Sequence, residues 1–128
     1  MSNKSSILCL ANQALYRIFD AGTNLNVLLS RNDPGLKDPK QMELVYGVLR
    51  RYYFLKTTIT PLLDKRIKRK DVDVELLILM GVYQIYFMKA PIYAVVNETV
   101  KVCDEIQKAW AKGPVSYTHL TLPTIYSV

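Results

Sequence analysis

The sequence predicts a single all-α domain, and three observations support this prediction. Apolar residues recur at three- and four-residue spacing in successive stretches, which is the period of an amphipathic helix. Residues that start and stop helices separate these stretches, and no stretch of the body alternates apolar and polar residues as a half-buried strand would. A length of 128 residues, half of them hydrophobic, suits one domain with one core.

The first two helices are expected to be short. The first runs from about residue 5 to 21 and is followed by Gly22, which tolerates the left-handed conformation after a helix end. The second covers residues 25–29, and the turn-forming residues 31–35 follow it. The first helix carries one apolar stripe, formed by Leu8, Ala11, Leu15, Ile18 and Phe19.

The third helix has the clearest start signal. Asp38 can cap it, Pro39 suits the first helical position, and Gln41 stands where a capping box requires Glu or Gln. Gly47 costs up to about 1 kcal/mol relative to alanine inside a helix, which indicates close approach by another helix. The apolar face continues to residue 59, where β-branched residues and a proline are expected to kink or break the helix.

A short helix over residues 62–67 and two longer helices are expected to complete the body. Residues 72–87 are nearly all apolar, and a helix that is apolar all round is buried all round, so this is the expected central helix. Asp71 can cap it. Pro91 then breaks the chain, and the last helix is expected over residues 92–110.

The tail differs from the body. Residues 114–128 are rich in threonine and show no helical period. We interpret them as a tail that does not belong to the domain of residues 1–113. The tail resembles the translated adapter sequence found at the ends of metagenomic contigs.

The net charge of +6 is concentrated in one segment. Residues 50–70 contain eight bases and one acid, whereas the flanking parts nearly balance. Such a segment attracts polyanions, and lysines and arginines that neutralise phosphates give salt-dependent nucleic-acid binding. The candidate phosphate-binding residues are Arg50, Arg51, Lys56, Lys65, Arg66, Lys68, Arg69 and Lys70.

Aromatic residues interrupt this basic segment. Tyr52 lies on the apolar stripe and is expected in the core, whereas Tyr53 is the candidate for stacking on an unpaired base. The alternative interpretation is a solvated helix face with ordinary core aromatics.

No catalytic or metal site is predicted. Cys9 and Cys103 lie far apart within apolar stripes and are expected to be buried hydrophobes. The single histidine, His119, lies in the tail, so neither a metal site nor a base that would activate a cysteine can be assembled. The sequence also lacks nucleotide-binding glycine motifs.

Two polar positions are expected to be structural, and the chain is expected to be cytoplasmic. The pair Asn97–Glu98 and the isolated Gln84 stand among apolar residues, and a buried hydrogen bond or a helix-end contact is expected for each. No apolar run reaches the roughly 18 residues that span a bilayer, and the first residues do not form a signal peptide.

Three blocks in order resemble the NusB-like RNA-binding domain. They are Glu-Leu-Val-Tyr-Gly-Val-Leu-Arg at residues 43–50, Met-Gly-Val-Tyr-Gln-Ile at 80–85 and Ala-Pro-Ile-Tyr-Ala-Val-Val-Asn-Glu-Thr-Val at 90–100. Gln84 and Arg50 make the likeness greatest to the version that opens RsmB/Sun-type small-subunit ribosomal RNA (cytosine-C5) methyltransferases.

The resemblance implies a fold of two small helical bundles and a role in binding ribosomal RNA. Methyl transfer would belong to a later domain that binds S-adenosylmethionine, so this chain alone is expected to have no cofactor and no catalysis. The sequence after Gly113 departs from the family pattern, which implies a truncated fragment that lacks a packing helix. Two alternatives stay open: a free NusB-like transcription antitermination factor, and a helical protein-interaction module that meets an acidic protein.

Overall fold

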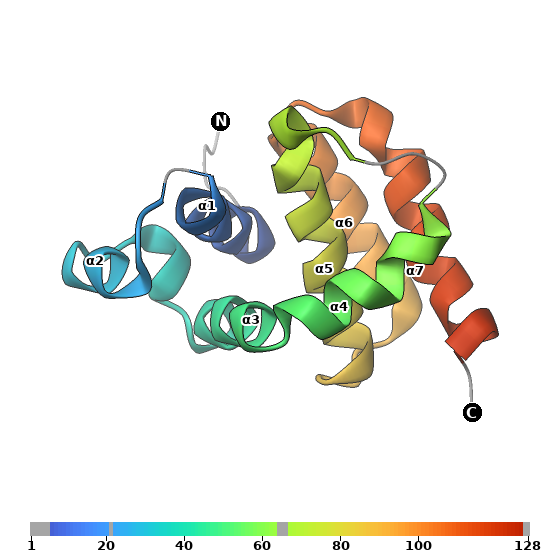
Figure 1. The fold of residues 1–128 in the computed structure, drawn as a ribbon, viewed down its shortest axis with the longest axis horizontal. Helices are drawn as coiled ribbons and strands as arrows, with labels where there is room; N and C mark the ends of the chain where they lie inside the picture. The colour runs from blue at the N-terminus through green and yellow to red at the C-terminus, as the bar shows by residue number, and fades with distance from the viewer. Residues whose placement is uncertain (1–5, 21, 64–66, 127–128) are drawn as a thin grey trace.

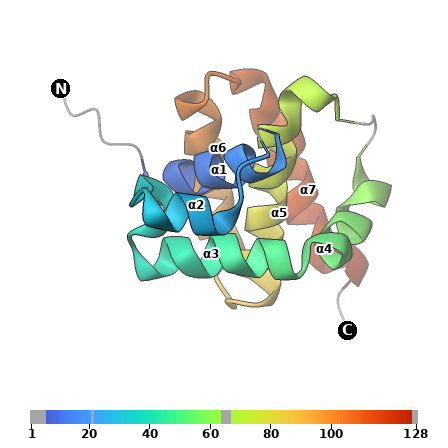
Figure 2. The same ribbon diagram turned by 60° about the vertical axis from the view of Figure 1, so that its left-hand side comes forward.

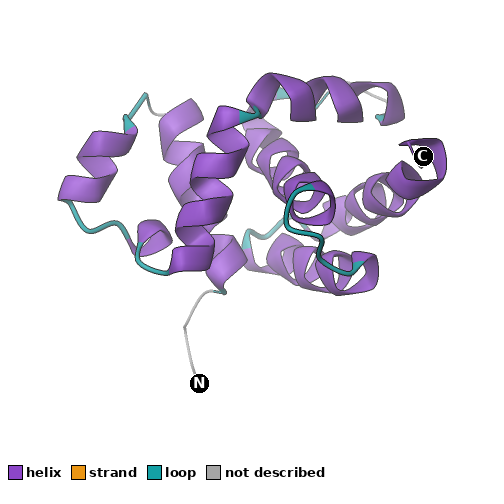
Figure 3. Cartoon of the chain, turned by 90° about the horizontal axis from the view of Figure 1, so that it is seen from below, coloured by secondary structure: helices purple, strands orange, loops and turns teal. Residues whose placement is uncertain are grey.

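The computed structural model describes residues 6–20, 22–63 and 67–126, with side chains described as far as Leu120. Within these ranges the chain forms helices joined by short loops, and no strand is present (Figure 3). The prediction of an all-α fold is confirmed. The α-helices are α1 (Ile7–Phe19), α2 (Leu25–Ser30), α3 (Pro39–Arg50), α4 (Tyr52–Ile59), α5 (Val72–Tyr86), α6 (Ile92–Glu105) and α7 (Lys112–Tyr126).

The helices form two groups that share α5. Figures 1 and 2 show α2 beside α1 and α3 on one side of the molecule, and α7 on the opposite side. Helix α5 contacts α1, α3, α4, α6 and α7, so it is the central helix, as predicted. Its buried residues cover every face of the helix because a buried run from Leu76 to Gln84 spans more than two turns.

The structure confirms two local predictions from the sequence, the helix start at Asp38 and the close helix approach at Gly47. The Asp38 carboxylate accepts a hydrogen bond from the Lys40 backbone N–H at 2.8 Å, and the Gln41 side chain accepts one from the Asp38 N–H at 3.0 Å. This is the predicted capping box. Gly47 faces the ring of Tyr83 on α5 so closely that an added Cβ would overlap it. The close helix approach predicted from Gly47 is therefore confirmed.

Two predicted helix boundaries are wrong. The third helix does not continue to residue 59, because Arg51 leaves the helical conformation (φ −112°, ψ 23°) and separates α3 from α4. The last helix ends at Glu105 rather than at residue 110, because Gln107 adopts a left-handed conformation (φ 60°). In both cases a single residue with an unusual backbone angle, which composition does not reveal, redirects the chain.

The short helix expected over residues 62–67 is also absent from the described part of that range. A 3-10 turn over Thr60–Leu62 is followed by extended backbone at Leu63 (φ −89°, ψ 124°). The proline in this turn marks the end of α4, as expected.

The expectation that the tail is not helical is wrong. Most of the tail belongs to helix α7, which packs against α5 and α6. Val115, Thr118 and His119 are buried on one face. Their spacing is helical, but two of the three are polar, so an apolar period could not reveal the face. An added Cβ at Gly81 of α5 would overlap the ring of His119.

Candidate nucleic-acid interface

The basic segment extends along the whole length of α5. Arg51 lies at the C-terminal end of α5, where its guanidinium carbon is 4.2 Å from the centroid of the Phe87 ring. Lys70 immediately precedes Asp71, the residue before the first turn of α5. At 1.5 Å per residue, positions 71 and 87 are roughly 24 Å apart along the helix. Lys65 and Arg66 lie outside the described residues.

Three of the predicted phosphate-binding residues meet at one groove. Lys56 on α4 and the pair Lys68 and Arg69 before α5 line a groove of about 1010 Å³. Pockets for small ligands have volumes of roughly 300–1000 Å³, so the groove has room for part of a nucleic acid. The other lining residues are Phe19, Tyr52, Thr60, Leu63, Ile67, Val72 and Glu75.

Lys56 is held in place by two neighbours. Its Nζ lies 3.3 Å from the Tyr52 hydroxyl and 3.7 Å from a Glu75 carboxylate oxygen. The hydrogen bond to Tyr52 and the charge of Glu75 raise the pKa of the Lys56 ammonium above its usual value. Lys56 therefore stays charged at neutral pH, although Glu75 offsets part of its attraction for phosphate.

Tyr52 and Tyr53 differ as the sequence indicates. Tyr52 is partly buried and stacks on Phe19 of α1, with the ring centroids 4.7 Å apart and the planes 30° from parallel. The side chain of Tyr53 is 83% exposed and meets Tyr52 edge-on at 5.5 Å. Tyr53 is thus accessible to a stacking partner, and Tyr52 is part of the packing between α1 and α4.

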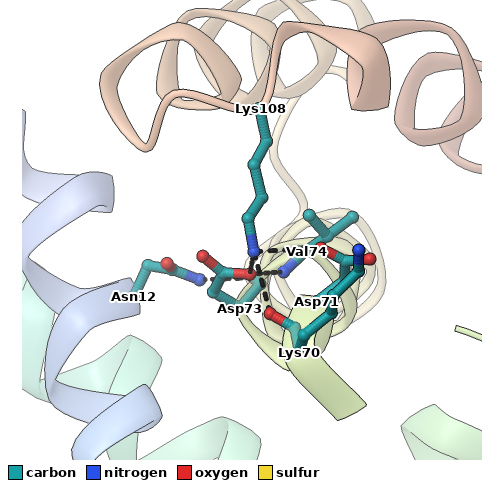
Figure 4. A network of polar contacts seen from close by, with 6 residues as sticks. All are labelled: Asn12, Lys70, Asp71, Asp73, Val74 and Lys108. Carbon is teal, nitrogen blue, oxygen red and sulfur yellow. Dashed lines mark hydrogen bonds and ion pairs between the residues drawn. The ribbon is translucent and has the colours of Figure 1, made fainter. Parts of the chain in front are cut away.

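An ion network holds the backbone beside Lys68, Arg69 and Lys70 (Figure 4). The Nζ of Lys108 lies 2.6 Å from an oxygen of Asp73 and 3.1 Å from one of Asp71, and it donates a hydrogen bond to the Lys70 carbonyl at 3.0 Å. Asn12 of α1 donates to the Asp73 carbonyl at 2.9 Å. The network therefore ties the N-terminal end of α5 to α1 and to the segment after α6.

The electrostatics of this network follow from its burial and its hydrogen bonds. Burial of the Lys108 ammonium lowers its pKa, but hydrogen bonds to Asp73 and Asp71 outweigh burial and raise the pKa above the usual value. Asp71 precedes α5 as predicted, but its side chain makes no capping hydrogen bond and pairs with Lys108 instead. Sequence reasoning did not identify Lys108, because 35 residues separate it from Asp73.

The remaining sequence candidates are dispersed. Cys9 and Cys103 are both buried, and burial raises the pKa of the Cys103 thiol to about 11, so it is protonated at neutral pH. His119 is buried with its Nε2 3.0 Å from the Ile78 carbonyl, and burial lowers its pKa to about 4. Gln84 is buried and donates to the Met80 carbonyl, which confirms its structural role.

The expectation for Asn97 and Glu98 is wrong. Both residues are exposed within α6, so neither provides a buried hydrogen bond or a helix-end contact. The helical period places them between the buried positions Val95 and Thr99, on the side that faces solvent. Among the residues that the structure describes, no three His, Cys, Asp or Glu side chains lie close enough to hold a metal ion. In the same part of the chain, every helix is too short or too polar to cross a membrane.

Comparison with known proteins identifies the family. The model of the NusB family matches residues 8–115. The chain belongs to the NusB family. This result confirms the resemblance drawn from the three sequence blocks.

The most similar proteins include three named for ribosomal RNA methylation. The chain is 34% identical over 116 residues to the probable ribosomal RNA small subunit methyltransferase B of Coxiella burnetii, which covers 91% of this chain and 26% of that protein. The ribosomal RNA small subunit methyltransferase B of Pseudomonas syringae is 39% identical over 71 residues, 56% of this chain and 16% of that protein. The enzyme of the same name from Erwinia tasmaniensis is 29% identical over 119 residues, 91% of this chain and 28% of that protein.

The alignments cover only part of each relative. The chain spans about a quarter of the length of the Coxiella burnetii protein and matches the N-terminal part of these relatives. The remaining three quarters of the Coxiella burnetii protein have no counterpart in these 128 residues. No solved structure matches the chain significantly.

Proposed function

We propose that this domain binds ribosomal RNA and positions it for the catalytic domain of a small-subunit ribosomal RNA methyltransferase. The observation that carries the proposal is the groove in which Lys56, Lys68 and Arg69 come together from two segments of the chain. The names of the relatives support the choice of RNA as the ligand and of a methyltransferase as the parent enzyme.

The groove suits a phosphate backbone better than a small neutral ligand. Lys68 and Arg69 are exposed, and no ion pair involving either is found among the described residues. Lys108 forms ion pairs with Asp71 and Asp73, the two carboxylates that follow this pair in the sequence. A polyanion would therefore meet exposed positive charge beside acids that are already paired.

The proposal assigns no binding site for the methyl donor to this domain. S-adenosylmethionine would bind in a catalytic domain outside this chain, and none of the residues described here is assigned to it. The role of Arg50, Arg51, Lys65, Arg66 and Lys70 as further phosphate contacts is part of the same proposal. That residues 114–128 are not native to the family stays a prediction, although α7 packs against α5 and α6.

The proposal is tested by measuring RNA affinity at several salt concentrations. The triple variant Lys56→Ala, Lys68→Ala and Arg69→Ala, which removes the three cations of the groove, should bind ribosomal RNA more weakly and with a flatter salt dependence. For single-stranded RNA each lost phosphate contact lowers the slope of log affinity against log salt by about 0.7, so three contacts give about 2.

A matched control removes the same charge elsewhere. Arg31, Lys37 and Lys101 are exposed on elements that do not line the groove. Their replacement by alanine in one variant should leave the salt slope nearly unchanged. Equal losses in the two triple variants would show that net charge, and not the groove, determines binding, and would contradict the proposal.

A further inference from the structure

Aromatic and cationic side chains from two helices form an exposed cluster at the C-terminal end of α5. The guanidinium of Arg51 lies over the ring of Phe87, and Phe54 meets the same ring edge-on with the centroids 5.9 Å apart. Phe54 is 54% exposed, and its neighbour Tyr53 is more exposed still. We refer to Arg51, Phe54 and Phe87 as the aromatic cluster; the ring of Tyr53 contacts Tyr52, and Tyr53 directly precedes Phe54 on α4.

The aromatic cluster packs on the protein core through Phe87. Phe87 stacks on Tyr83 with the centroids 5.3 Å apart and the planes 27° from parallel, and Tyr83 is buried in the core beside Gly47. The Phe87 ring is therefore held by a residue that packs against α3. Arg51 lies over this ring and is exposed, so its guanidinium is open to solvent.

The stretches of sequence that carry the cluster contain bases and no acids. The sequence contains no aspartate or glutamate over residues 44–63 or over residues 76–97, which cover α4 and the C-terminal half of α5. Arg50 and Lys89 are exposed near the two ends of the cluster in sequence. A ligand with a negative charge and a planar face complements this surface.

We propose that the aromatic cluster binds an unpaired nucleotide of the RNA ligand, with the base stacked on Arg51 and against Tyr53 or Phe54. This inference rests on the proposed RNA-binding function. Unpaired bases stack on arginine planes and on aromatic rings, whereas bases inside a duplex are already stacked and are not accessible. The cluster thus selects RNA with a loop, a bulge or a single-stranded stretch, and Arg50 contacts the adjacent phosphate.

The experiment compares two RNAs of equal length and charge with the 128-residue chain. One is a hairpin that carries 2-aminopurine in its loop, and the other is fully paired with 2-aminopurine in the stem. Stacking on the cluster should quench the fluorescence of the loop base only. The double variant Tyr53→Leu and Phe54→Leu should abolish this quenching and weaken loop binding roughly tenfold, with little change for the duplex.

Two further variants separate stacking from charge and from general surface effects. Arg51→Lys keeps the charge but removes the planar face, so it should weaken loop binding while leaving the salt slope unchanged. Tyr93 of α6 is 80% exposed, and Tyr93→Leu is the matched control that should change neither quantity. Circular dichroism confirms that each variant remains helical.

The outcomes distinguish this inference from the proposed function. If the chain binds RNA with the expected salt slope but the cluster variants bind loop and duplex as the unchanged chain does, the inference is wrong and the proposed function stands. Unquenched 2-aminopurine in the bound hairpin overturns it as well, and leaves the cluster as a contact for a protein. If the unchanged chain binds neither RNA at low salt, the proposed function and the inference both fail.

Discussion

The two ends of α5 hold parts of the same basic segment by different physical means. At the N-terminal end, Lys108 fixes the backbone beside Lys70 through ion pairs with Asp71 and Asp73. At the C-terminal end, Arg51 rests on the aromatic ring of Phe87. The N-terminal end depends on ion pairs, because a partly buried charge without a partner is costly. The C-terminal end depends on packing against an aromatic ring. The two ends should therefore respond differently to mutation, pH and salt.

The largest effect is expected at the ionic end. Lys108→Met leaves Asp71 and Asp73 without their cation, and their side chains are only 12% and 17% exposed. Removing one partner of a fully buried pair costs about 3–5 kcal/mol, so this partly buried network should lose about 2–3 kcal/mol of unfolding free energy. Denaturant unfolding measures the loss. Lys108→Arg, which keeps the charge, should retain most of the stability, and an equal loss in both variants would contradict the ionic explanation.

The pH dependence of this difference sharpens the comparison. The folded-state pKa of Lys108 is raised above its unfolded value of 10.5, so its contribution is fully present below that pH and is lost as pH rises through the folded pKa. The stability difference between the unchanged chain and Lys108→Met should therefore be constant at neutral pH and shrink above about pH 10.5. Urea unfolding of both proteins across this range measures the change. A difference that does not vary with pH would exclude the ion pairs as its source.

At the aromatic end, the expected loss is about 2 kcal/mol. Gly47→Ala places a methyl group against the Tyr83 ring, which must shift and disturb the stack with Phe87. Overpacking of this kind costs about 1–3 kcal/mol. Thermal unfolding measures the loss, which should not vary between neutral and alkaline pH as the Lys108 effect does. Gly113→Ala is the matched control, because an added Cβ there meets nothing within 4 Å.

The smallest effects are expected for the two exposed cations. Arg51→Met should cost about 0.5–1 kcal/mol, the usual range for an exposed cation over an aromatic ring. Lys56→Met should cost less than about 0.5 kcal/mol, because its pair with Glu75 is long at 3.7 Å and the lysine side chain is 48% exposed. Chemical denaturation in low and high salt measures both. If salt weakens the Arg51 contribution as strongly as that of Lys56, the proposed difference between the two ends is wrong.

Local signals explain which parts of the fold could be predicted. The Asp38 capping box and the apolar run of α5 each depend on neighbouring residues, and both were read correctly. The ends of α3 and α6 depend on the backbone angles of Arg51 and Gln107, residue types that also occur within helices. Packing against other helices selects these angles, so a local pattern does not reveal them.

The candidate site also has features that the sequence predicts and features that it does not. The excess of positive charge over residues 50–70 and the exposure of Tyr53 could be inferred from composition and helical period. The role of Lys108 and the contact of Arg51 with Phe87 could not, because each joins residues more than 30 positions apart. The buried face of α7 was missed for another reason, since it uses Thr118 and His119 rather than apolar residues alone.

Sequence alone was sufficient to specify an all-helical domain, its central helix and the segment that carries its excess positive charge. These properties follow from composition and from periods of a few residues, whereas the resemblance to the NusB family rests on three sequence blocks. The folded chain distributes that charge along α5, placing Lys56, Lys68 and Arg69 at one groove and Arg51 on an aromatic ring at the C-terminal end of that helix. The physical reason is that α4 and the chain leading to α5 pack across the central helix, so distance in space no longer follows distance in sequence.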